Sequence, residues 1–350
     1  MRTLTLLLML LSSAADAQAY KAVKRWVAGC DNTRHCSATG FAPEDDAVYA
    51  MLHFERGGAG GDAVTRMTLR ADAGIERGRA WVLRADDAEL LQIAPAQLVD
   101  ADSGPGIDIV IDAADDIAAV LGALRGADAL AIVGDGEVVG VVSAAGASAV
   151  LLWIDERQQR LGTSTAFVRK GALPADSVPP PPPTPRVRPR ADGRQLDDVE
   201  ARRLGKLVRE TLEADTCEEP DADRGQADSA WALADGRTLV QLGCYAGAYN
   251  FGSSWFLLAQ GQSPQRIAFP VPAEDGSGRM ATTGELVNAG YDAASGTLGM
   301  FSKGRGIGDC GASGEWTWDG QRFQLLEYRS MGDCQGVTMD FWPQLWRTQR

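Results

Sequence analysis

Histidine is scarce in this sequence, and the common catalytic motifs are missing. Only two histidines, His35 and His53, occur among the 350 residues. There is no G-x-S-x-G elbow to favour a serine hydrolase and no G-x-x-x-x-G-K-[ST] loop to favour nucleotide binding. The 47 acidic residues are too numerous for a catalytic pair to be identified among them. The sequence therefore identifies no catalytic residue and predicts no cofactor.

Positive charge is also in deficit. The chain has 34 Lys and Arg residues against 47 Asp and Glu residues, which gives a net charge of -13 at pH 7. Nucleic acids and anionic lipid surfaces are recognised through excess positive charge, so neither is expected as a partner. Beyond the N-terminal segment, no run is apolar enough to form a membrane helix, and we expect no membrane span.

The N-terminal segment has the pattern of a secretory leader. Met1 and Arg2 are followed by an apolar run over residues 4–11, and small residues end the segment at Ala17-Gln18-Ala19. A charged start, a short apolar run and a small-residue cleavage site are typical of a signal peptide. We predict a signal peptide over residues 1–19 and a periplasmic or secreted mature protein.

The six cysteines fit an exported protein. Their number is even, and thiols in oxidising compartments form disulfides, so three bridges are expected. Six cysteines allow 15 connectivities, and pairing in sequence order is favoured because a proline-rich segment separates the first two from the last four. The favoured bridges are Cys30–Cys36, Cys217–Cys244 and Cys310–Cys334. Zinc binding by cysteines with His35 or His53 has the wrong ligand spacing, so no metal site is predicted.

Residues 173–194 divide the chain. This segment contains Pro179–Pro183, Pro185 and Pro189, and it contains almost no apolar side chains. Consecutive prolines favour an extended polyproline II conformation, which acts as a semi-rigid spacer. The sequence therefore predicts a linker between two domains of ordinary size, over residues 20–172 and 195–350.

Residues 20–172 are predicted to form an α+β domain. Runs of β-forming residues predict strands, and capped segments that end near Gly126 and Gly162 predict helices. The predicted strands are 23–30, 48–54, 63–69, 81–83 and 107–111, and the predicted helices are 115–124 and 147–161.

Residues 195–350 are predicted to form a helix followed by a mainly antiparallel β domain. Asp197 or Asp198 caps an amphipathic helix that extends to about Ala214. Its apolar side is predicted to contain Val199, Leu204, Leu207, Val208 and Leu212. The predicted strands are 229–233, 238–245, 254–259, 267–270, 285–289, 297–302 and 337–342, with a hairpin before the last of these.

That hairpin is centred on Asp319-Gly320, a dipeptide typical of type I′ turns. A two-residue loop pairs Trp318 with Gln321 and Trp316 with Phe323, which places both tryptophans on one face of the hairpin. Large aromatic residues at period two are usually buried, so this face is interpreted as core. An exposed aromatic platform for a sugar or a peptide is the functional alternative.

A glycine-rich basic loop precedes the hairpin. In it Lys303 and Arg305 alternate with Gly304, Gly306 and Gly308, and Cys310 follows. Successive amides in such a loop can form an anion-binding nest beside the two cations. The alternative interpretation is a tight turn that delivers Cys310 to its disulfide.

Three stretches carry a resemblance to a known family. They are W-x-x-x-CDNT-x-x-C from Trp26 to Cys36, CY-x-GAYN from Cys244 to Asn250, and KGRGIGDCG with W-x-WDG-x-x-F from Lys303 to Phe323. Together they resemble the DUF1176 family of bacterial envelope proteins, which are marked by six cysteines and have no known function. The resemblance covers nearly the whole mature chain and implies an exported protein, but it supplies no catalytic residues.

The sequence favours a non-catalytic binding or interaction module in the cell envelope, because disulfide-linked β domains joined by a rigid spacer are suited to presenting surfaces. An envelope protein or a cell-wall component is the expected partner, and the oligomeric state is left open. Two alternatives remain: a hydrolase of peptidoglycan or glycan, which needs two carboxylates in one cleft, and an inhibitor or structural protein.

Overall fold

A computed structural model describes residues 19–44, 49–71, 74–102, 106–190, 193–212, 217, 227–273 and 279–350. The predicted signal peptide lies outside the described residues except for Ala19. None of the described helices is long and apolar enough to cross a membrane.

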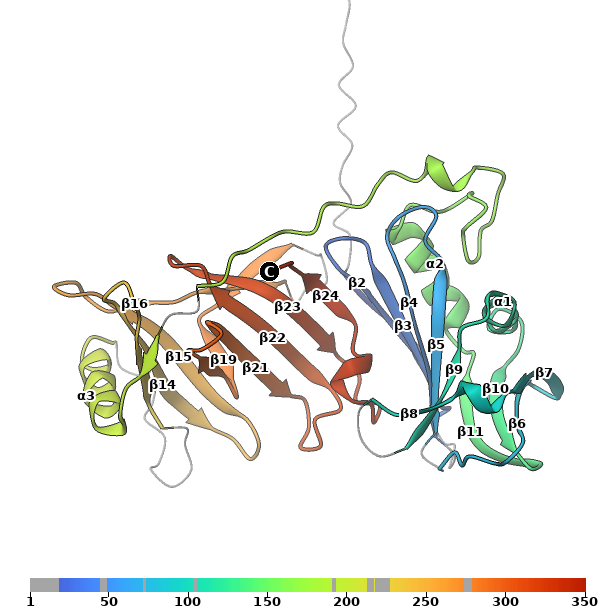
Figure 1. Ribbon diagram of the computed structural model, residues 1–350, viewed down its shortest axis with the longest axis horizontal. Helices are drawn as coiled ribbons and strands as arrows, with labels where there is room; N and C mark the ends of the chain where they lie inside the picture. The colour runs from blue at the N-terminus through green and yellow to red at the C-terminus, as the bar shows by residue number, and fades with distance from the viewer. Residues whose placement is uncertain are drawn as a thin grey trace, which may run out of the picture.

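The molecule is elongated and consists of antiparallel β-sheets with three α-helices among the described residues. Figure 1 shows the N-terminal part at one end, the C-terminal part at the other, and the described part of the proline-rich segment, residues 173–190, passing along one side of both. Every pair of neighbouring strands within the sheets is antiparallel, and parallel pairing is confined to isolated bridges.

The N-terminal part contains a seven-stranded and a four-stranded sheet. The larger sheet has, in spatial order, β1 (Tyr20–Val23), β2 (Trp26–Cys30), β3 (Cys36–Phe41), β4 (Ala50–Arg56), β5 (Val64–Ala71), β9 (Ile107–Ile111) and β8 (Leu98–Asp100). The smaller sheet has β11 (Glu137–Ser143), β10 (Ala129–Gly134), β6 (Trp81–Ala85) and β7 (Ala88–Ile93). Helices α1 (Ala114–Ala123) and α2 (Ala147–Arg157) pack on these sheets.

The prediction of a distinct α+β N-terminal domain is wrong, because strands dominate this part of the chain. Six strands of this part were not predicted: β1, β3, β7, β8, β10 and β11. They include an interior strand of the larger sheet and three of the four strands of the smaller one. Asp135 and Gly136 both have positive φ, 49° and 88°, and they form the tight turn between β10 and β11. The second predicted helix is also shorter, since α2 ends at Arg157.

The core of the N-terminal part lies between the sheets and the two helices. Trp26, Trp81 and Val150 are each 2% exposed or less and belong to one apolar cluster. The Trp26 indole N–H donates to the carbonyl oxygen of Ser143 at 2.7 Å, so this large ring brings no unpaired donor into the core. This bond joins the larger sheet to the end of the smaller one.

The C-terminal part contains three sheets. The largest has β12 (Arg194–Gln195), β13 (Ser229–Ala232), β14 (Thr238–Ala246), β15 (Phe251–Leu258) and β16 (Gln265–Arg266), with β19 (Glu285–Val287) also paired to β15. The second has β20 (Gly290–Asp292), β21 (Thr297–Lys303), β22 (Gly311–Trp318), β23 (Phe323–Met331) and β24 (Gln344–Arg347). The third pairs β17 (Phe269–Pro272) with β18 (Met280–Thr283). The strand predicted at 337–342 is wrong, since Met339–Phe341 form a 3-10 turn instead.

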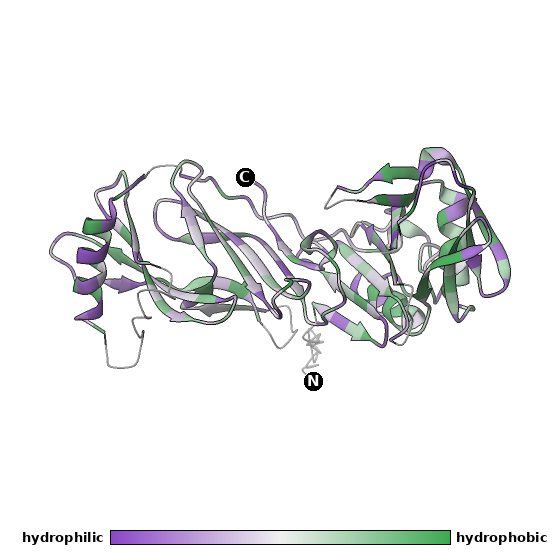
Figure 2. Cartoon of the chain, turned by 90° about the horizontal axis from the view of Figure 1, so that it is seen from below, coloured by the Kyte–Doolittle hydropathy of each residue, from purple (hydrophilic) through white to green (hydrophobic). Residues whose placement is uncertain are grey.

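Helix α3 (Asp198–Arg209) covers one face of the largest C-terminal sheet. Asp197 caps it by accepting a hydrogen bond from the Glu200 backbone N–H at 2.9 Å, as the sequence predicts. Leu204 and Val208 are buried against the sheet, whereas Val199 is 71% and Leu207 44% exposed, so these two were wrongly assigned to the apolar side. Figure 2 shows the helix at the far end of the molecule with many hydrophilic residues on it.

The two parts of the chain share an apolar cluster. Val27 and Met51 from the N-terminal part are buried together with Met331, Phe341 and Trp342 from the C-terminal part. A Cβ atom at Gly29 would lie 2.5 Å from the Cβ atom of Pro343, so glycine permits this close approach of β2. The division into domains at residues 173–194 stays a prediction, and the two parts are packed against each other.

Candidate binding groove beneath the proline-rich segment

The proline-rich segment runs beside the last residues of the chain instead of standing free. The Val187 N–H donates to the Gln349 carbonyl oxygen at 3.0 Å, and the Gln349 N–H donates to the Pro185 carbonyl oxygen at 2.9 Å. Farther along, the Arg190 N–H donates to the Trp318 carbonyl oxygen at 2.8 Å. Proline cannot donate such bonds, so the contacts use the carbonyl of a proline and the amides of residues between prolines.

A cavity of about 720 Å³ lies between this segment and the second C-terminal sheet. Residues 185–188 form one wall of this binding groove, and the β22–β23 loop with the start of β23 forms another. The apolar surface in the groove comes from Pro185, Val187, Pro270, Met280, Leu325 and Trp346.

Positive charge enters the groove from both walls. Arg186 and Arg188 are exposed on the proline-rich segment, and Arg322 is exposed on the β22–β23 loop. Arg186 donates from Nε to the side-chain oxygen of Gln349 at 3.1 Å, which is a neutral partner. Among the described residues, Arg188 has no ion-pair partner. Guanidinium groups placed in this way can bind carboxylates or phosphates through paired hydrogen bonds.

Asp319 is the single acid among the residues that line the groove. Its Oδ1 accepts hydrogen bonds from the backbone N–H groups of Gln321 and Arg322 at 2.8 and 2.9 Å, and its Oδ2 accepts from the Gln324 amide at 2.7 Å. Burial raises the pKa of Asp319, but the Gln324 side chain and these backbone N–H groups outweigh burial, and the pKa lies below its ordinary value. The Asp319 carboxylate therefore stabilises the loop between β22 and β23.

Trp346 supplies the aromatic surface of the groove. Its indole N–H points to the Leu325 carbonyl oxygen at 3.2 Å and to Thr348 Oγ1 at 2.9 Å. These contacts hold the ring beside β23 and leave its side chain partly exposed. A fixed, partly exposed tryptophan next to cations is suited to stacking on a sugar ring or on an aliphatic part of a ligand.

The predicted aromatic hairpin forms, but its tryptophans do not reach the groove. Trp316 and Trp318 are buried in the core of the C-terminal part, where Trp316 packs edge-on against Phe269 and Trp318 is tilted against Phe323. The predicted register is wrong: Trp318 pairs with Phe323 and Trp316 with Leu325, which leaves a four-residue loop. The side chain of Asp319 closes this wider loop by binding two backbone N–H groups, an effect that the turn dipeptide alone does not reveal.

The glycine-rich basic loop is occupied largely by its own contacts. Arg305 forms an ion pair with Asp309 through Nε at 2.7 Å, and Asp309 also accepts from the Gly336 N–H at 2.6 Å. The N–H groups of Gly304 and Gly308 donate to the carbonyl oxygens of Cys310 and Arg305. The Lys303 N–H donates to Asn250 Oδ1 at 3.1 Å, whereas the Lys303 ammonium and the Gly306 N–H have no hydrogen-bond partner among the described residues.

These contacts favour one of the two interpretations of the glycine-rich basic loop. Two of the amides proposed for an anion nest are already used, and one of the two cations is already paired, so the geometry favours the tight turn into Cys310. A Cβ atom at Gly304 would lie 2.6 Å from the Cys310 sulfur, which explains one glycine in that turn. Anion binding by Lys303 and Arg305 stays a prediction.

The three disulfides join the cysteines in sequence order. They connect Cys30 to Cys36, Cys217 to Cys244 and Cys310 to Cys334. Asp309, Cys310 and Cys334 bring a carboxylate and two sulfurs within 4.8 Å of one another. Because both sulfurs belong to a disulfide, they offer no thiolate ligand and this group is not a metal centre.

The comparisons with known proteins identify the family. The family model described as "Protein of unknown function (DUF1176)" matches residues 20–349. The chain belongs to the DUF1176 family. It is also 31% identical over 357 residues to the Uncharacterized protein YpfG of Escherichia coli (strain K12), an alignment that covers 95% of this chain and 94% of that protein. No solved structure matches the chain.

The structure explains why one DUF1176 motif, CDNT-x-x-C, has these residues in this chain. Asp31 Oδ1 accepts from the Thr33 N–H at 2.8 Å, from the Thr33 hydroxyl at 2.7 Å and from the His35 N–H at 3.0 Å, which closes the loop inside the disulfide. Its other oxygen forms an ion pair with Arg347 on β24. The Asn32 side chain pairs with the backbone of Arg347. The motif therefore attaches the first disulfide to the end of the chain.

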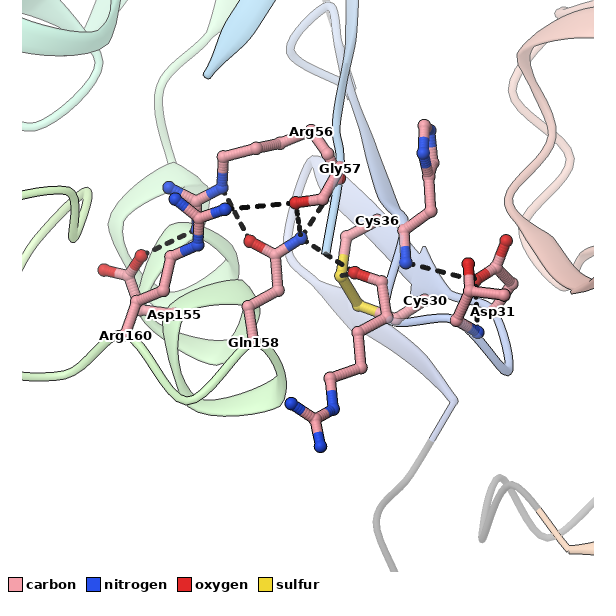
Figure 3. Close-up of a disulfide and its surroundings, with 11 residues drawn as sticks. Cys30, Asp31, Cys36, Arg56, Gly57, Asp155, Gln158 and Arg160 are labelled. Carbon is pink, nitrogen blue, oxygen red and sulfur yellow. Dashed lines mark hydrogen bonds and ion pairs between the residues drawn. A yellow bond between two sulfur atoms is a disulfide. The ribbon is translucent and has the colours of Figure 1, made fainter. Parts of the chain in front are cut away.

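A buried network on the other side of this loop was missed in the sequence. Gln158 donates to the carbonyl oxygens of Arg34, Arg56 and Gly57 at 2.8–3.0 Å, and its own oxygen accepts from Arg56 Nε at 2.7 Å. Arg56 also pairs with buried Asp155 at 2.9 Å. Burial lowers the pKa of Arg56 to about 9 despite this partner. Figure 3 shows Gln158 lying between Arg56 and Arg160 on one side and the Cys30–Cys36 disulfide loop on the other.

In the sequence, Asp155, Glu156, Arg157 and Arg160 fit the solvated side of the predicted helix 147–161. Asp155 is fully buried instead, as is Arg160 just beyond the helix. Arg160 donates to the backbone carbonyl oxygens of Gly57, Ala59, Gly60 and Asp62. No periodic pattern signals these roles, because Arg56 and the four carbonyl groups lie about 100 residues away in the chain.

Proposed function

We propose that this protein is an exported, non-catalytic binding module of the cell envelope, and that the groove beneath the proline-rich segment holds an anionic glycan. The relatives named above carry no assigned activity, so the proposal rests on the site. The observation that carries it is the placement of Arg186, Arg188 and Arg322 on two walls of the largest of the four cavities described, which Trp346 also lines.

Export is supported by covalent chemistry. All six cysteines are in disulfides, and structural disulfides persist in oxidising compartments such as the periplasm or the extracellular space. The leader pattern at residues 1–19 is the second argument. A cell-wall component is the partner class that both the location and the groove favour.

An anionic glycan fits the groove for two reasons. Uronate carboxylates can each accept two parallel hydrogen bonds from a guanidinium group, and sugar rings stack on tryptophan. The net charge of the chain is -13, so a cluster of arginines with one internally bonded carboxylate is a local exception on an acidic molecule. Such an exception directs an anion to this place.

Binding is favoured over the hydrolase alternative by the distribution of acids. The four described cavities have one acidic lining residue each: Asp319, Asp62, Glu55 and Glu315. Glycoside hydrolysis usually requires two carboxyl groups that face one bond. Among the described residues, no protruding loop favours an inhibitory or structural role.

The proposal is tested by calorimetry with tetragalacturonate, using neutral maltotetraose as the uncharged control. We expect the first to bind and the second not to bind. Replacement of both Arg188 and Arg322 by Gln removes two charge-assisted interactions and should weaken binding at least about tenfold, since one such hydrogen bond contributes about 1.5–3 kcal/mol. Raising the salt concentration should weaken binding in the same direction.

A matched control separates the groove from general charge. Arg202 and Lys206 are exposed on α3, and changing both to Gln alters the net charge by the same amount. This variant should bind tetragalacturonate as the wild type does. Equal loss in both double variants, or tighter binding of tetraglutamate than of tetragalacturonate, would reject the glycan site.

A further inference from the structure

The two histidines of the chain converge on one carboxylate. His35 precedes β3 and His53 lies on β4, and both reach Glu55, also on β4. His35 Nε2 lies 3.0 Å from Glu55 Oε2, and His53 Nε2 lies 3.7 Å from Glu55 Oε1. All three side chains line a cavity of about 400 Å³. This His–Glu–His cluster is on the N-terminal part, away from the residues of the proposed glycan groove.

Hydrogen bonding favours one tautomer of His53. The Thr39 hydroxyl donates to the Phe341 carbonyl oxygen at 3.2 Å, and Thr39 Oγ1 lies 2.9 Å from His53 Nδ1. Because a hydroxyl has one proton, the bond to Phe341 leaves Thr39 Oγ1 as the acceptor of a hydrogen bond from His53 Nδ1–H. In the neutral ring Nε2 then has a lone pair.

That lone pair faces the carboxylate of Glu55. Two electron-rich groups do not attract each other, so the arrangement is stable with a positive species at His53 Nε2: a proton or a metal cation. The ring is held in place, because Phe341 packs edge-on against it with ring centroids 5.3 Å apart. An Nδ1–H that is oriented by a partner, with Nε2 left available, is the usual state of a histidine that binds a metal.

A further polar atom lies on the same face of the sheet. Ser37 pairs with Glu55 across β3 and β4, and its side chain therefore shares a face with Glu55 and His53. Ser37 is 4% exposed, and its hydroxyl oxygen has no hydrogen-bond partner in the part of the chain that the structure describes. Buried hydroxyls normally have one, so this oxygen is available to a polar species on the same face of the sheet.

We propose that His35, His53 and Glu55 bind a divalent transition metal ion of the zinc class. Two imidazoles and one carboxylate are ligands of a kind used in open zinc sites, where water fills the remaining position. The cysteines take no part, unlike in the zinc scheme considered from the sequence. The Nε2 atoms of His35 and His53 contact opposite oxygens of Glu55. For both rings to bind one metal ion, His35 has to turn towards His53. His35 has 26% of its side chain exposed and borders the cavity, which leaves it room to turn.

Arg66 also lines this cavity and is exposed. Its positive charge opposes a cation, and no other Lys or Arg lines the cavity. Replacing Arg66 by Gln should therefore leave metal affinity equal or raise it, because the positive charge is removed while a shorter polar side chain stays in place. This variant is the matched control for changes to the ligands.

The test is calorimetric titration of the metal-free, disulfide-intact mature protein with zinc chloride at pH 7.5. We expect one ion per chain. His35→Gln, His53→Gln and Glu55→Gln should each weaken binding at least tenfold, and Arg66→Gln should not. Thr39→Val removes the oriented partner of His53, together with the Thr39 hydrogen bond to the Phe341 carbonyl oxygen, and should cost about 10–100-fold in affinity, as loss of such outer contacts does.

The measurements also separate a metal from a proton. Imidazole ¹⁵N chemical shifts of the metal-free protein should show His53 as the neutral Nδ1–H form at pH 7.5, with Nε2 shifting when zinc is added. A doubly protonated His53 at this pH with no zinc binding would overturn the proposal in favour of a proton. Wild-type affinity in both histidine variants, with folding verified by circular dichroism, would overturn it as well.

Discussion

The side-chain amide of Asn32 pairs with the backbone of Arg347 as a neighbouring β-strand would. Asn32 Nδ2 donates to the Arg347 carbonyl oxygen at 3.1 Å, and Asn32 Oδ1 accepts from the Arg347 N–H at 2.8 Å. The two residues are 315 positions apart. One side chain therefore satisfies both backbone groups of an edge strand and joins the first disulfide loop to the C-terminal strand.

Asn32→Asp should destabilise the protein although it hardly changes the shape of the side chain. The carboxylate keeps the acceptor but places a second electron-rich oxygen against the Arg347 carbonyl. We expect a loss of about 1–3 kcal/mol in the free energy of unfolding, the cost of an unsatisfied buried partner. Urea unfolding followed by tryptophan fluorescence measures it. Gln262→Glu, the same kind of change at an exposed position, should stay within about 0.5 kcal/mol.

The buried pair of Arg56 and Asp155 should be far more sensitive than a surface pair. Asp155 also accepts from the N–H groups of Phe167 and Val168, both at 2.9 Å, so Asp155→Asn turns one acceptor into a donor facing a donor. It also leaves Arg56 buried without its counter-charge. We expect a loss of about 3–5 kcal/mol.

The comparison for this pair is Glu200→Gln, which breaks the exposed pair of Glu200 with Arg203 on α3. Exposed pairs contribute about 0–1 kcal/mol, so its urea midpoint should barely move. Equal losses in Asp155→Asn and Glu200→Gln would contradict the structural role assigned to the buried network.

Local patterns predicted elements with their own turn or cap signal, and they failed where partners are distant. The cap at Asp197 was predicted because an Asn or Asp before an amphipathic run is a local signal. The hairpin around Asp135-Gly136 carries the same kind of turn dipeptide as Asp319-Gly320 and could have been predicted from it. Without β10 and β11, the strand content of the N-terminal part was underestimated.

The candidate sites depend on long-range register. The spacing of His53 and Glu55, two residues apart on one strand, places them on one face. The position of His35 beside them follows from the pairing of β3 with β4, and β3 was not predicted. The glycan groove brings residues 185–188 to residues 319–348, which no local pattern reveals.

Cleavage of the proline-rich segment should not separate the two parts of the chain. Arg186 and Arg190 are exposed, and trypsin is expected to cut after them. The fragments should nevertheless elute together in gel filtration, because Val27 and Met51 are buried against Trp342 in the shared cluster. Trp342→Ala removes a large fully buried ring from that contact and should allow separation. Fragments of the wild type that elute apart would show instead that the segment is an independent spacer.

Acid should weaken the glycine-rich loop through Asp309. Its ion pair with Arg305 is the largest cause that lowers the Asp309 pKa, and the hydrogen bond from the Gly336 N–H adds to it. A carboxyl whose pKa is lowered in the folded state stabilises that state above its unfolded pKa, about 3.9 for aspartate. This stabilisation is lost as the pH falls through the lower folded value.

The stability difference between wild type and Asp309→Asn should therefore be constant from about pH 5 to pH 8 and should shrink below about pH 4. Arg305→Gln should lessen the stability difference between wild type and Asp309→Asn only slightly at neutral pH, because the guanidinium is half exposed and the ion pair is screened by solvent. Urea midpoints at pH 7, 5 and 3 measure both effects. Asp176→Asn, at an exposed carboxyl that has no partner among the described residues, provides the baseline. A difference that stays constant down to pH 3 would mean that Asp309 does not hold the loop through its charge.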